Sequence, residues 1–425
     1  MMTNKNDLEQ VMLDLGAKAR AATHHLAEAD TDQKNAVLQE AANQLRASCA
    51  ALIIANAKDM ENAKASGVNE ARLDRILLDE ARINAIANAV ETIIALPDPV
   101  GVALAKWQVP SGLNIERRRV PLGVIGIIYE SRPNVTADAA ALCLKSGNVV
   151  ILRNSSEIVE SARLIHQCFT QALVKIGLPE ACVQMVPTSD RKAVGHLLQG
   201  LNGQIDVIVP RGGRGLVERV QQDARVPVFS HLEGICHVYV HEQADVKMAH
   251  DIVINAKMRR TGICGAAENL LIDKKWGTDN IAALLAALAD AGCEVRGDDA
   301  ACAANTKVIA AIEADWATEY LDAILSVRVI DTIDDAIAHI AHYGSAHTEA
   351  IITNDDAAAT DFLNRVDSAI VMHNCSTQFA DGGEFGMGAE IGIATGRFHA
   401  RGPVGLEQLT SFKYVVKGNG QTRPK

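Results

Sequence analysis

The sequence predicts an α/β protein with two α/β domains, a cleft between them, and a small β arm. Short apolar runs typical of buried strands alternate with helical patterns after residue 120, as expected for parallel sheets covered by helices. The alternation forms two series, which meet near Gly234. A chain of 425 residues is also longer than one hydrophobic core usually organises.

The first hundred residues are predicted to be helical. Apolar residues recur at helical spacing through Leu8, Val11, Met12 and Leu15, and the pattern returns after residue 31. The run Leu96–Pro99 contains two prolines, which end the helical pattern.

The first α/β series follows this helical region. Its predicted strands are Pro121–Ile128, Val149–Leu152, Cys182–Val186 and Ile205–Val209, and its predicted helices are Asn134–Ser146, Ile158–Ile176 and Arg191–Leu198. This order of strands and helices indicates right-handed crossovers in a doubly wound sheet.

The second series begins near Gly234. Its predicted strands are Cys236–Val240, Asn269–Ile272, Leu325–Ile330, Glu349–Ile352 and Ser368–Met372, and its predicted helices are Val246–Lys257, Asn280–Ala291, Ile333–His342 and Ala357–Val366. Two further runs, Leu113–Val120 and Leu409–Val416, mix apolar with charged residues, which predicts half-exposed strands, the first of them in an arm.

Composition excludes several functional classes. The net charge of -11 argues against nucleic-acid binding, which needs an excess of cations. The nine cysteines are scattered without a C-x-x-C pair, so neither a disulfide framework nor a zinc site is expected, and a reducing cytoplasm fits. The histidines show no ligand spacing, so no metal site is predicted. We also expect no signal peptide and no membrane span.

Cys264 is the candidate nucleophile. Three cations precede it within Lys257–Arg260, small residues flank it, and a strand-like run follows it. Positive charge favours the reactive thiolate, and small neighbours allow backbone N–H groups to approach a developing oxyanion. A buried, unreactive thiol is the alternative interpretation.

The cofactor candidates lie at the ends of two predicted strands, where open α/β sheets bind ligands. Arg153, Ser155 and Ser156 suit a ribose or its phosphate, although the serines also suit a helix N-cap. Gly212 and Gly213 form a glycine- and arginine-rich turn that suits a phosphate, or a plain turn. The usual G-x-G-x-x-G fingerprint is absent.

Other candidates surround the first strand and the C-terminal region. Arg132 suits a carboxylate or phosphate, and Asn134 suits either an oxyanion donor or a helix cap. The glycine-rich run Asp381–Glu390, with Gly382 and Gly383, predicts an ordered loop, and Arg401 follows it.

Several of these runs together resemble the gamma-glutamyl phosphate reductases, also called glutamate-5-semialdehyde dehydrogenases, of the aldehyde dehydrogenase superfamily. The resemblance rests on Glu130–Thr136, Gly147–Arg153, Asn255–Cys264, Asp381–Glu390 and His399–Pro403, and it spans nearly the whole chain. Before the cysteine, Lys257 and Arg260 keep the family pattern, whereas Met258, Arg259 and Thr261 differ from it.

The resemblance implies an aldehyde dehydrogenase-like fold. It implies an NADPH-binding domain at residues 1–105 and 121–233, a catalytic domain at 234–404, and oligomerisation segments at 106–120 and 405–425. It also implies a cytoplasmic homo-oligomer, with glutamate 5-kinase as a candidate partner.

By the same resemblance, Cys264 is the nucleophile and Asn134 the oxyanion donor. Glu319 binds the nicotinamide ribose, Arg153, Ser155 and Ser156 bind the adenosine ribose and its phosphate, and Gly212 and Gly213 complete the cofactor site. Arg132, Gly382, Gly383 and Arg401 are the predicted substrate residues.

The implied reaction is NADPH-dependent reduction of L-glutamyl 5-phosphate through a cysteine thioester, the second step of proline biosynthesis. Two alternatives remain open. One is a hydrolytic aldehyde dehydrogenase that uses Glu233 as a base, and the other is a nucleotide-binding protein without a catalytic thiol, against which the missing G-x-x-x-x-G-K-[ST] counts.

Overall fold

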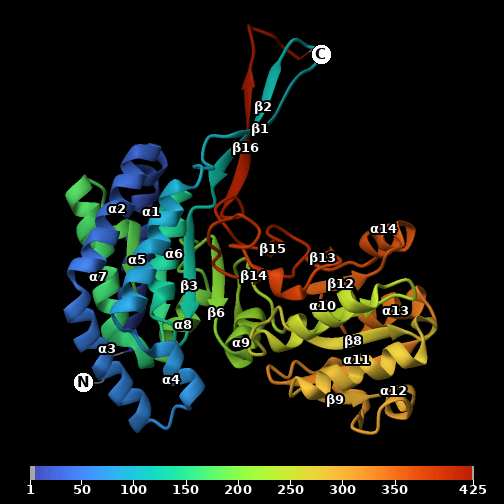
Figure 1. The fold of residues 1–425 in the computed structure, drawn as a ribbon. Helices are drawn as coiled ribbons and strands as arrows, with labels where there is room; N and C mark the ends of the chain where they lie inside the picture. Colours follow the sequence, from blue (N-terminus) through green and yellow to red (C-terminus); the bar gives the residue numbers. More distant parts are fainter. Residues whose placement is uncertain (1–4, 424–425) are drawn as a thin grey trace. The chain divides into compact units, whose positions relative to one another are not determined.

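The computed structural model describes residues 5–423 (Figure 1). Contacts between residues divide the chain into two compact units. The first comprises Met1–Ser230, Met387–Gly392 and Val404–Lys425, and the second comprises His231–Gly386 and Ile393–Pro403. Each unit contains its own parallel sheet.

The first unit opens with the predicted helices. They are α1 (Lys5–Glu28), α2 (Thr31–Ala47), α3 (Cys49–Ala65), α4 (Glu70–Ile76) and α5 (Glu80–Ala95). Asp30, Asn69 and Asp79 each accept a backbone N–H at the start of a helix, which satisfies a donor that the helix leaves unpaired.

The core of the first unit is a parallel sheet in the order β5-β4-β3-β6. Its strands are β3 (Val124–Tyr129), β4 (Val149–Asn154), β5 (Val183–Met185) and β6 (Val207–Arg211), and the connecting helices are α6 (Asn134–Lys145), α7 (Val159–Ile176), α8 (Arg191–Leu198) and α9 (Arg214–Asp223). Helices α6 and α7 cover one face, while α1 and α8 cover the other. This is the doubly wound arrangement that the sequence predicts.

One predicted strand is divided in the structure. The run Pro121–Ile128 contains the last residue of β2 (Asn114–Pro121) and most of β3. Gly123 separates them with a φ of 125°, a conformation that side chains rarely adopt. A Cβ atom there would lie 2.1 Å from Asp206 Oδ2, so glycine is required at this bend.

The two half-exposed runs form one small sheet. Strand β2 lies between β1 (Ala103–Gln108) and β16 (Thr410–Lys417), and both pairings are antiparallel. Figure 1 shows β16, from the end of the chain, lying against β2. Strand β1 was not among the predicted strands. A hollow of about 390 Å³ over this sheet is lined by Trp107, Ile115 and Val415, among other residues.

The second unit is a seven-stranded parallel sheet in the order β10-β9-β11-β8-β7-β12-β13. Its strands are β7 (Cys236–Val240), β8 (Ala267–Asp273), β9 (Glu294–Gly297), β10 (Ile309–Ala310), β11 (Ile324–Ile330), β12 (Thr348–Ile352) and β13 (Ile370–His373). The sequence predicts all of them except β9, which is short and mostly polar, and β10, which has only two residues.

Helices cover both faces of this sheet. Helices α10 (Val246–Met258), α11 (Thr278–Asp290) and α12 (Asp299–Ala304) enclose one apolar cluster, which contains Val253 and Leu284. Helices α13 (Ile333–Tyr343) and α14 (Asp356–Arg365) enclose another, around Tyr239 and Phe362.

Among the described residues, no helix combines the length and apolar character that crossing a bilayer requires.

Candidate active site

Cys264 lies in the turn between α10 and β8, and its side chain is partly exposed. Gly234 holds this turn in place. A Cβ atom on Gly234 would lie 2.1 Å from the carbonyl oxygen of Cys264 and 2.7 Å from its Cα. The segment before β7 and the turn before β8 therefore touch backbone to backbone, which only glycine allows.

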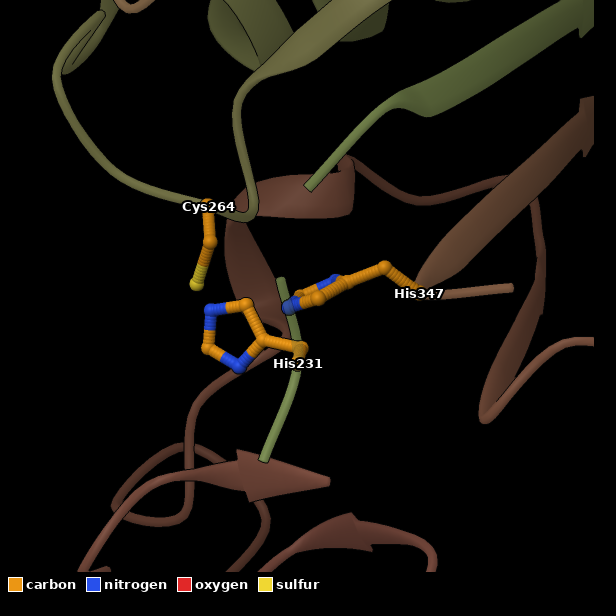
Figure 2. Close-up of side chains that lie close together, drawn as sticks. All are labelled: His231, Cys264 and His347. Carbon is orange, nitrogen blue, oxygen red and sulfur yellow. The ribbon is translucent and has the colours of Figure 1, made fainter. Parts of the chain in front are cut away.

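Two histidines lie beside Cys264. The ligand atoms of His231, Cys264 and His347 all lie within 4.8 Å of one another, and Figure 2 shows the three side chains together. Cys264 precedes β8, His231 precedes β7 and His347 precedes β12. These strands are parallel neighbours in the order β8-β7-β12, so the segments that enter them meet at one edge of the sheet.

Hydrogen bonds fix both rings. His231 Nδ1 lies 2.7 Å from the carbonyl oxygen of Ile393, which can only accept, so Nδ1 carries a proton. In the neutral ring Nε2 is then the acceptor, and Figure 2 shows this side of the ring facing the sulfur. His347 Nδ1 lies 2.9 Å from Thr348 Oγ1.

Among the described residues, the buried Nε2 atom of His347 has no hydrogen-bond partner. The ring centroids of His231 and His347 lie 5.0 Å apart.

Burial distinguishes Cys264 from most other cysteines. It raises the thiol pKa of seven, which are Cys143, Cys168, Cys182, Cys236, Cys293, Cys302 and Cys375. A raised pKa keeps these thiols protonated and unreactive. One of them, Cys236, lies against the site, and its Sγ donates to the carbonyl oxygen of Cys264 at 3.0 Å.

One cation expected to act on Cys264 has another role. Lys257 is fully buried and its Nζ lies 2.6 Å from Glu268 Oε2. Burial raises the pKa of Glu268 to about 7, while Lys257 opposes that rise. Because Glu268 offsets the charge of Lys257, the sequence argument from three nearby cations is weakened.

Glu319 lies next to the same turn. Its Oε1 accepts the backbone N–H of Gly234 at 2.8 Å. Burial raises its pKa, the bond from Gly234 and the charge interaction with His231 lower it, and the charge of Glu233 raises it. Binding of the nicotinamide ribose by Glu319 remains a prediction.

The predicted cofactor residues of the first unit meet at the carboxyl edge of its sheet. Arg153 is the next-to-last residue of β4, opposite Ile128 of β3, while Ser155 and Ser156 follow that strand. The side chain of Arg153 is buried and donates from Nη2 to the carbonyl oxygen of Ser189 at 3.1 Å. Ser155 is the N-cap residue of a short 3-10 helix, Ser156–Ile158, but its Oγ accepts the N–H of Ser131 instead of a helix donor.

Arg191 and Arg219 lie near Arg153. Burial lowers the pKa of Arg153, Glu130 opposes the change, and the charges of Arg191 and Arg219 lower the pKa further. Its Nε is buried without a hydrogen-bond partner among the described residues. The sequence analysis did not identify Arg191 or Arg219, because only the fold brings α8 and α9 to the end of β4.

The glycine turn has a carboxylate partner. The N–H of Gly213, the N-cap residue of α9, donates to Glu130 Oε2 at 3.1 Å, and a Cβ atom on Gly212 would lie 2.6 Å from the same oxygen. Glu130 thus lies where an anionic ligand would interact with this helix N-terminus.

Asn134 begins α6, and Pro133 is the N-cap residue, so the cap alternative for Asn134 is wrong. Its Nδ2 donates to Asp138 Oδ2 at 2.9 Å. Burial raises the pKa of Asp138 to about 6, and Asn134 and Arg211 act in the opposite direction. Arg132 is exposed just before this helix.

The predicted substrate residues of the second unit are differently exposed. Gly382 is buried, whereas Gly383 is exposed and its N–H donates to Asp381 Oδ1 at 2.7 Å. Arg401 donates to Asp367 Oδ1 at 2.7 Å and to the Asp367 carbonyl oxygen at 3.0 Å. The pKa of Asp367 is lowered chiefly by the bond from Arg401. An ion pair within the unit thus already uses two donors of Arg401.

Sequence reasoning also missed His231 and His347. The spacing of the histidines along the chain gives no indication of a shared site. In the run His231–Gly234, only Glu233 is a candidate from the sequence. The position of this run before a predicted strand next to the cysteine strand was the one signal available.

Comparison with known proteins agrees with this architecture. The model of the Aldehyde dehydrogenase family matches residues 4–315. A gamma-glutamyl phosphate reductase of Parvibaculum lavamentivorans is 60% identical over 424 residues and covers 100% of both chains. One from Beijerinckia indica is 60% identical over 421 residues, 99% of this chain and 98% of its own.

Solved structures give the same result. The gamma-glutamyl phosphate reductase of Thermotoga maritima superimposes with a TM-score of 0.95 at 42% identity, over 97% of this chain and 100% of its own. An acetylating aldehyde dehydrogenase from Geobacillus thermoglucosidasius, 16% identical with a TM-score of 0.69 over 100% of both chains, shares the fold. The chain therefore belongs to the aldehyde dehydrogenase family and groups within it with the gamma-glutamyl phosphate reductases.

Proposed function

We propose that this enzyme reduces L-glutamyl 5-phosphate to L-glutamate 5-semialdehyde and phosphate with NADPH, as the second step of proline biosynthesis. The observation that carries the proposal is a partly exposed thiol, Cys264, beside two histidines in a chain 60% identical to gamma-glutamyl phosphate reductases. A glutamate 5-kinase would supply the acyl phosphate.

The reaction begins at Cys264. Its thiolate attacks the acyl carbon, an S–C bond forms, the C–O bond to phosphate breaks, and phosphate leaves. The Nε2 atom of His231 is suited to accept the proton that the thiol loses, because Ile393 holds the opposite nitrogen protonated. The product is a thioester on Cys264, which divides a difficult reduction into two easier steps.

Bound NADPH supplies the hydride that reduces this thioester. The resulting thiohemiacetal then loses its C–S bond, which releases the aldehyde and restores the thiol group. In both steps a negative charge develops on the oxygen bonded to the reacting carbon. The Cys264 backbone N–H and the Asn134 side-chain amide are the proposed donors to it. Asp138 would orient the Asn134 amide by accepting one of its two N–H groups.

The residues at the carboxyl edge of the first sheet fit an anionic dinucleotide. The charges of Arg191 and Arg219 disfavour the charged form of Arg153, against the opposite effect of Glu130 and Asp190, so a phosphate bound beside Arg153 would stabilise its charge. The unpaired Nε of Arg153 adds a donor that a 2′-phosphate or ribose would satisfy. Ser155, Ser156, Gly212 and Gly213 lie on the same edge, with Glu319 of the second unit as the proposed ribose ligand.

The proposed substrate residues have unequal support. Arg132 is exposed at the start of α6, and Gly383 is exposed in its loop, so both can meet a ligand. Gly382 is buried, and Arg401 is bound to Asp367. Both would therefore assist substrate binding by holding the loop in its conformation and not by contacting the substrate directly.

We also propose that the β1–β2–β16 sheet joins copies of the chain in a homo-oligomer. Strands β1 and β16 are its edges, and an exposed edge offers backbone groups to another chain. Phe412, Tyr414 and Val416 on β16 are 44%, 58% and 54% exposed, which is unusual for a strand that faces only water.

The deciding experiment is oxidation of glutamate 5-semialdehyde with NADP⁺ in the presence and absence of phosphate or arsenate. A reductase of an acyl phosphate needs the anion to release the thioester, so NADPH should form only when phosphate or arsenate is present. Oxidation without either anion would instead indicate a hydrolytic aldehyde dehydrogenase, with Glu233 as the base to test.

A further inference from the structure

We propose that Cys264, His231 and His347 form a binding site for Zn²⁺ that blocks the catalytic thiol. One sulfur and two imidazole nitrogens are a ligand set typical of zinc, and here their atoms all lie within 4.8 Å of one another (Figure 2). Sequence spacing predicts no metal site, because the three residues reach one another only through the strand order β8-β7-β12.

The distances are close to those of a metal site. Zn–S and Zn–N bonds of about 2.3 and 2.0–2.1 Å in a tetrahedron place the ligand atoms about 3.3–3.6 Å apart. The largest of these separations, at most 4.8 Å, would therefore have to shorten by no more than about 1.5 Å for a tetrahedral site to form. Cys264 can supply that movement, since its side chain is partly exposed in a turn between α10 and β8.

His347 gives an independent indication of a ligand. Its side chain is fully buried, yet among the described residues its Nε2 has no hydrogen-bond partner. A buried polar atom without a partner is costly, and a bound metal would satisfy it. Thr348 Oγ1 lies 2.9 Å from the other nitrogen of this ring and would orient it toward the metal.

His231 has the hydrogen bond expected of a zinc ligand. Metal-binding histidines usually donate their second N–H to a carbonyl or carboxylate, which fixes the ring and its tautomer. The carbonyl oxygen of Ile393, 2.7 Å from Nδ1, provides this bond. Nε2 is then the coordinating atom, on the side of the ring that faces the sulfur.

The surrounding charge also favours a cation. The Glu319 carboxylate interacts electrostatically with His231, and the Glu233 carboxylate lies close enough to Glu319 to raise its pKa. The nearby ammonium group of Lys257 is neutralised by Glu268 at 2.6 Å. One carboxylate therefore interacts with a proposed ligand, and the buried cation of this region has its own counter-ion.

Zinc binding would convert the thiol to a coordinated thiolate and release one proton to solvent. A zinc-bound sulfur cannot attack an acyl phosphate, so enzyme activity would fall reversibly. The binding part of this inference is independent of the reaction catalysed, whereas the inhibition rests on the proposed function.

The test uses full-length protein without a polyhistidine tag, freed of metals by dialysis, with Co²⁺ as a spectroscopic substitute for Zn²⁺. We expect a thiolate-to-cobalt charge-transfer band that Zn²⁺ abolishes and EDTA removes. Zn²⁺ should also slow alkylation of Cys264 by iodoacetamide. His347→Gln and His231→Gln should each raise the Zn²⁺ dissociation constant at least about ten-fold, and Cys264→Ser should remove the charge-transfer band.

Matched controls come from the same unit. His342→Gln and Cys375→Ser replace a histidine outside the cluster and a thiol outside it, so both should bind Zn²⁺ like the original protein. Circular dichroism melting curves show whether each variant is folded. The alkylation experiment needs no variant, so it remains decisive if the His347 variant does not fold.

The inference is overturned if Co²⁺ gives no thiolate band, or if Zn²⁺ leaves the alkylation rate of Cys264 unchanged. The proposed function is tested separately, by reductase activity in metal-free buffer. Zinc binding without any reductase activity would retain the metal site and reject the function. Reductase activity without zinc binding would retain the proposed function and reject the metal site.

Discussion

At the scale of single residues, exposure and neighbours distinguish Cys264 from the other cysteines. Burial keeps seven of the other thiols protonated, including that of Cys236, which contacts the Cys264 carbonyl oxygen. Two histidines and the Gly234 backbone surround the Cys264 turn. Reactivity therefore follows from the site, since the residue type is the same at all nine positions.

The first prediction concerns the thiol itself. Cys264→Ala should lower turnover at least about a thousand-fold, because no other group can form the thioester, while NADPH binding measured by fluorescence titration should persist. Cys375→Ala is the control and should keep most activity. Cys236→Ala should have a small effect, since it removes only the weak contacts of a neutral thiol with the Cys264 carbonyl oxygen and with His347 Nδ1. Substantial turnover by Cys264→Ala would reject the mechanism.

The second prediction concerns Gly234. Gly234→Ala should lower both activity and melting temperature, because the new Cβ would overlap the Cys264 backbone at 2.1 Å and strain of this kind costs about 1–3 kcal/mol. Gly215→Ala is the matched control, since a Cβ there meets nothing within 4 Å. Kinetics and melting curves of both variants provide the measurement. Equal behaviour would show that the two segments can separate without consequence.

At the scale of secondary-structure elements, the two sheets present their candidate residues at opposite ends of the strands. In the first unit the cofactor candidates lie at the end of β4 and after β6, at the carboxyl ends where open α/β sheets usually bind ligands. In the second unit His231, Cys264 and His347 precede β7, β8 and β12 respectively, at the amino ends. The general rule thus locates the cofactor candidates but not the thiol.

The third prediction concerns Arg153 at the end of β4. If it binds the 2′-phosphate, Arg153→Ala should raise the KM for NADPH about ten- to a hundred-fold, since a charge-assisted hydrogen bond contributes about 1.5–3 kcal/mol, and should raise that for NADH much less. Arg191→Ala should also raise the KM for NADPH. Lys192→Ala replaces the next cation along the chain, which is exposed like Arg191, and should leave that KM unchanged. Equal losses with both cofactors and a lower melting temperature would instead indicate that Arg153 only anchors Ser189.

The fourth prediction concerns Asp138 on α6. Its pKa of about 6, raised by burial from 3.8, means that the folded state retains the proton longer than the unfolded chain. This contribution to stability is complete below about pH 4 and is lost as the pH rises through about 6. Asp138→Asn lacks the titration, so between pH 4 and 7 it should gain on the order of 2 kcal/mol relative to the original protein.

Urea unfolding at several pH values provides this measurement. The side-chain oxygen of asparagine can still accept the Asn134 amide, so the hydrogen bond itself is retained in the variant. A stability difference that does not change with pH would show that Asp138 ionises normally.

At the scale of the whole molecule, the small β1–β2–β16 sheet joins two distant parts of the sequence. Strand β16 pairs with β2 along its whole length, from Thr410 opposite Pro121 to Lys417 opposite Asn114. Trp107 and Tyr414 meet edge to face at 6.1 Å. This sheet is separate from both parallel sheets, which favours the proposed role in assembly.

The fifth prediction tests that role. Val416→Lys should lower the molecular mass measured by sedimentation, because a charge on the apolar edge strand opposes pairing between copies. Val174→Lys is the matched control, since Val174 is 61% exposed on α7 of the same unit. The free energy of unfolding of both variants should stay within about 0.5 kcal/mol of the original value, as is usual for exposed substitutions. An unchanged mass for Val416→Lys would argue against assembly through β16.

The sequence by itself determined the two α/β series, most of their strands and helices, and the family. Apolar periodicity reports burial locally, so Cys236–Val240 and Arg191–Leu198 are predicted to the residue. The exceptions are informative: β1 and β9 lack a clear apolar pattern, β10 has only two residues, and Gly123 divides a run that sequence alone treats as one strand. Long motifs such as Asp381–Glu390 carried the family resemblance, because many specific residues must match in order.

Only the tertiary structure decided which side chains meet. His231, Cys264 and His347 are distant in sequence, and they come together because β8, β7 and β12 are parallel neighbours. Lys257 looked like a cation beside the thiol, yet Glu268 neutralises it; Arg401 looked available, yet Asp367 binds it. Pairing between charges and between strands is non-local, so periodicity along the chain contains no information about it.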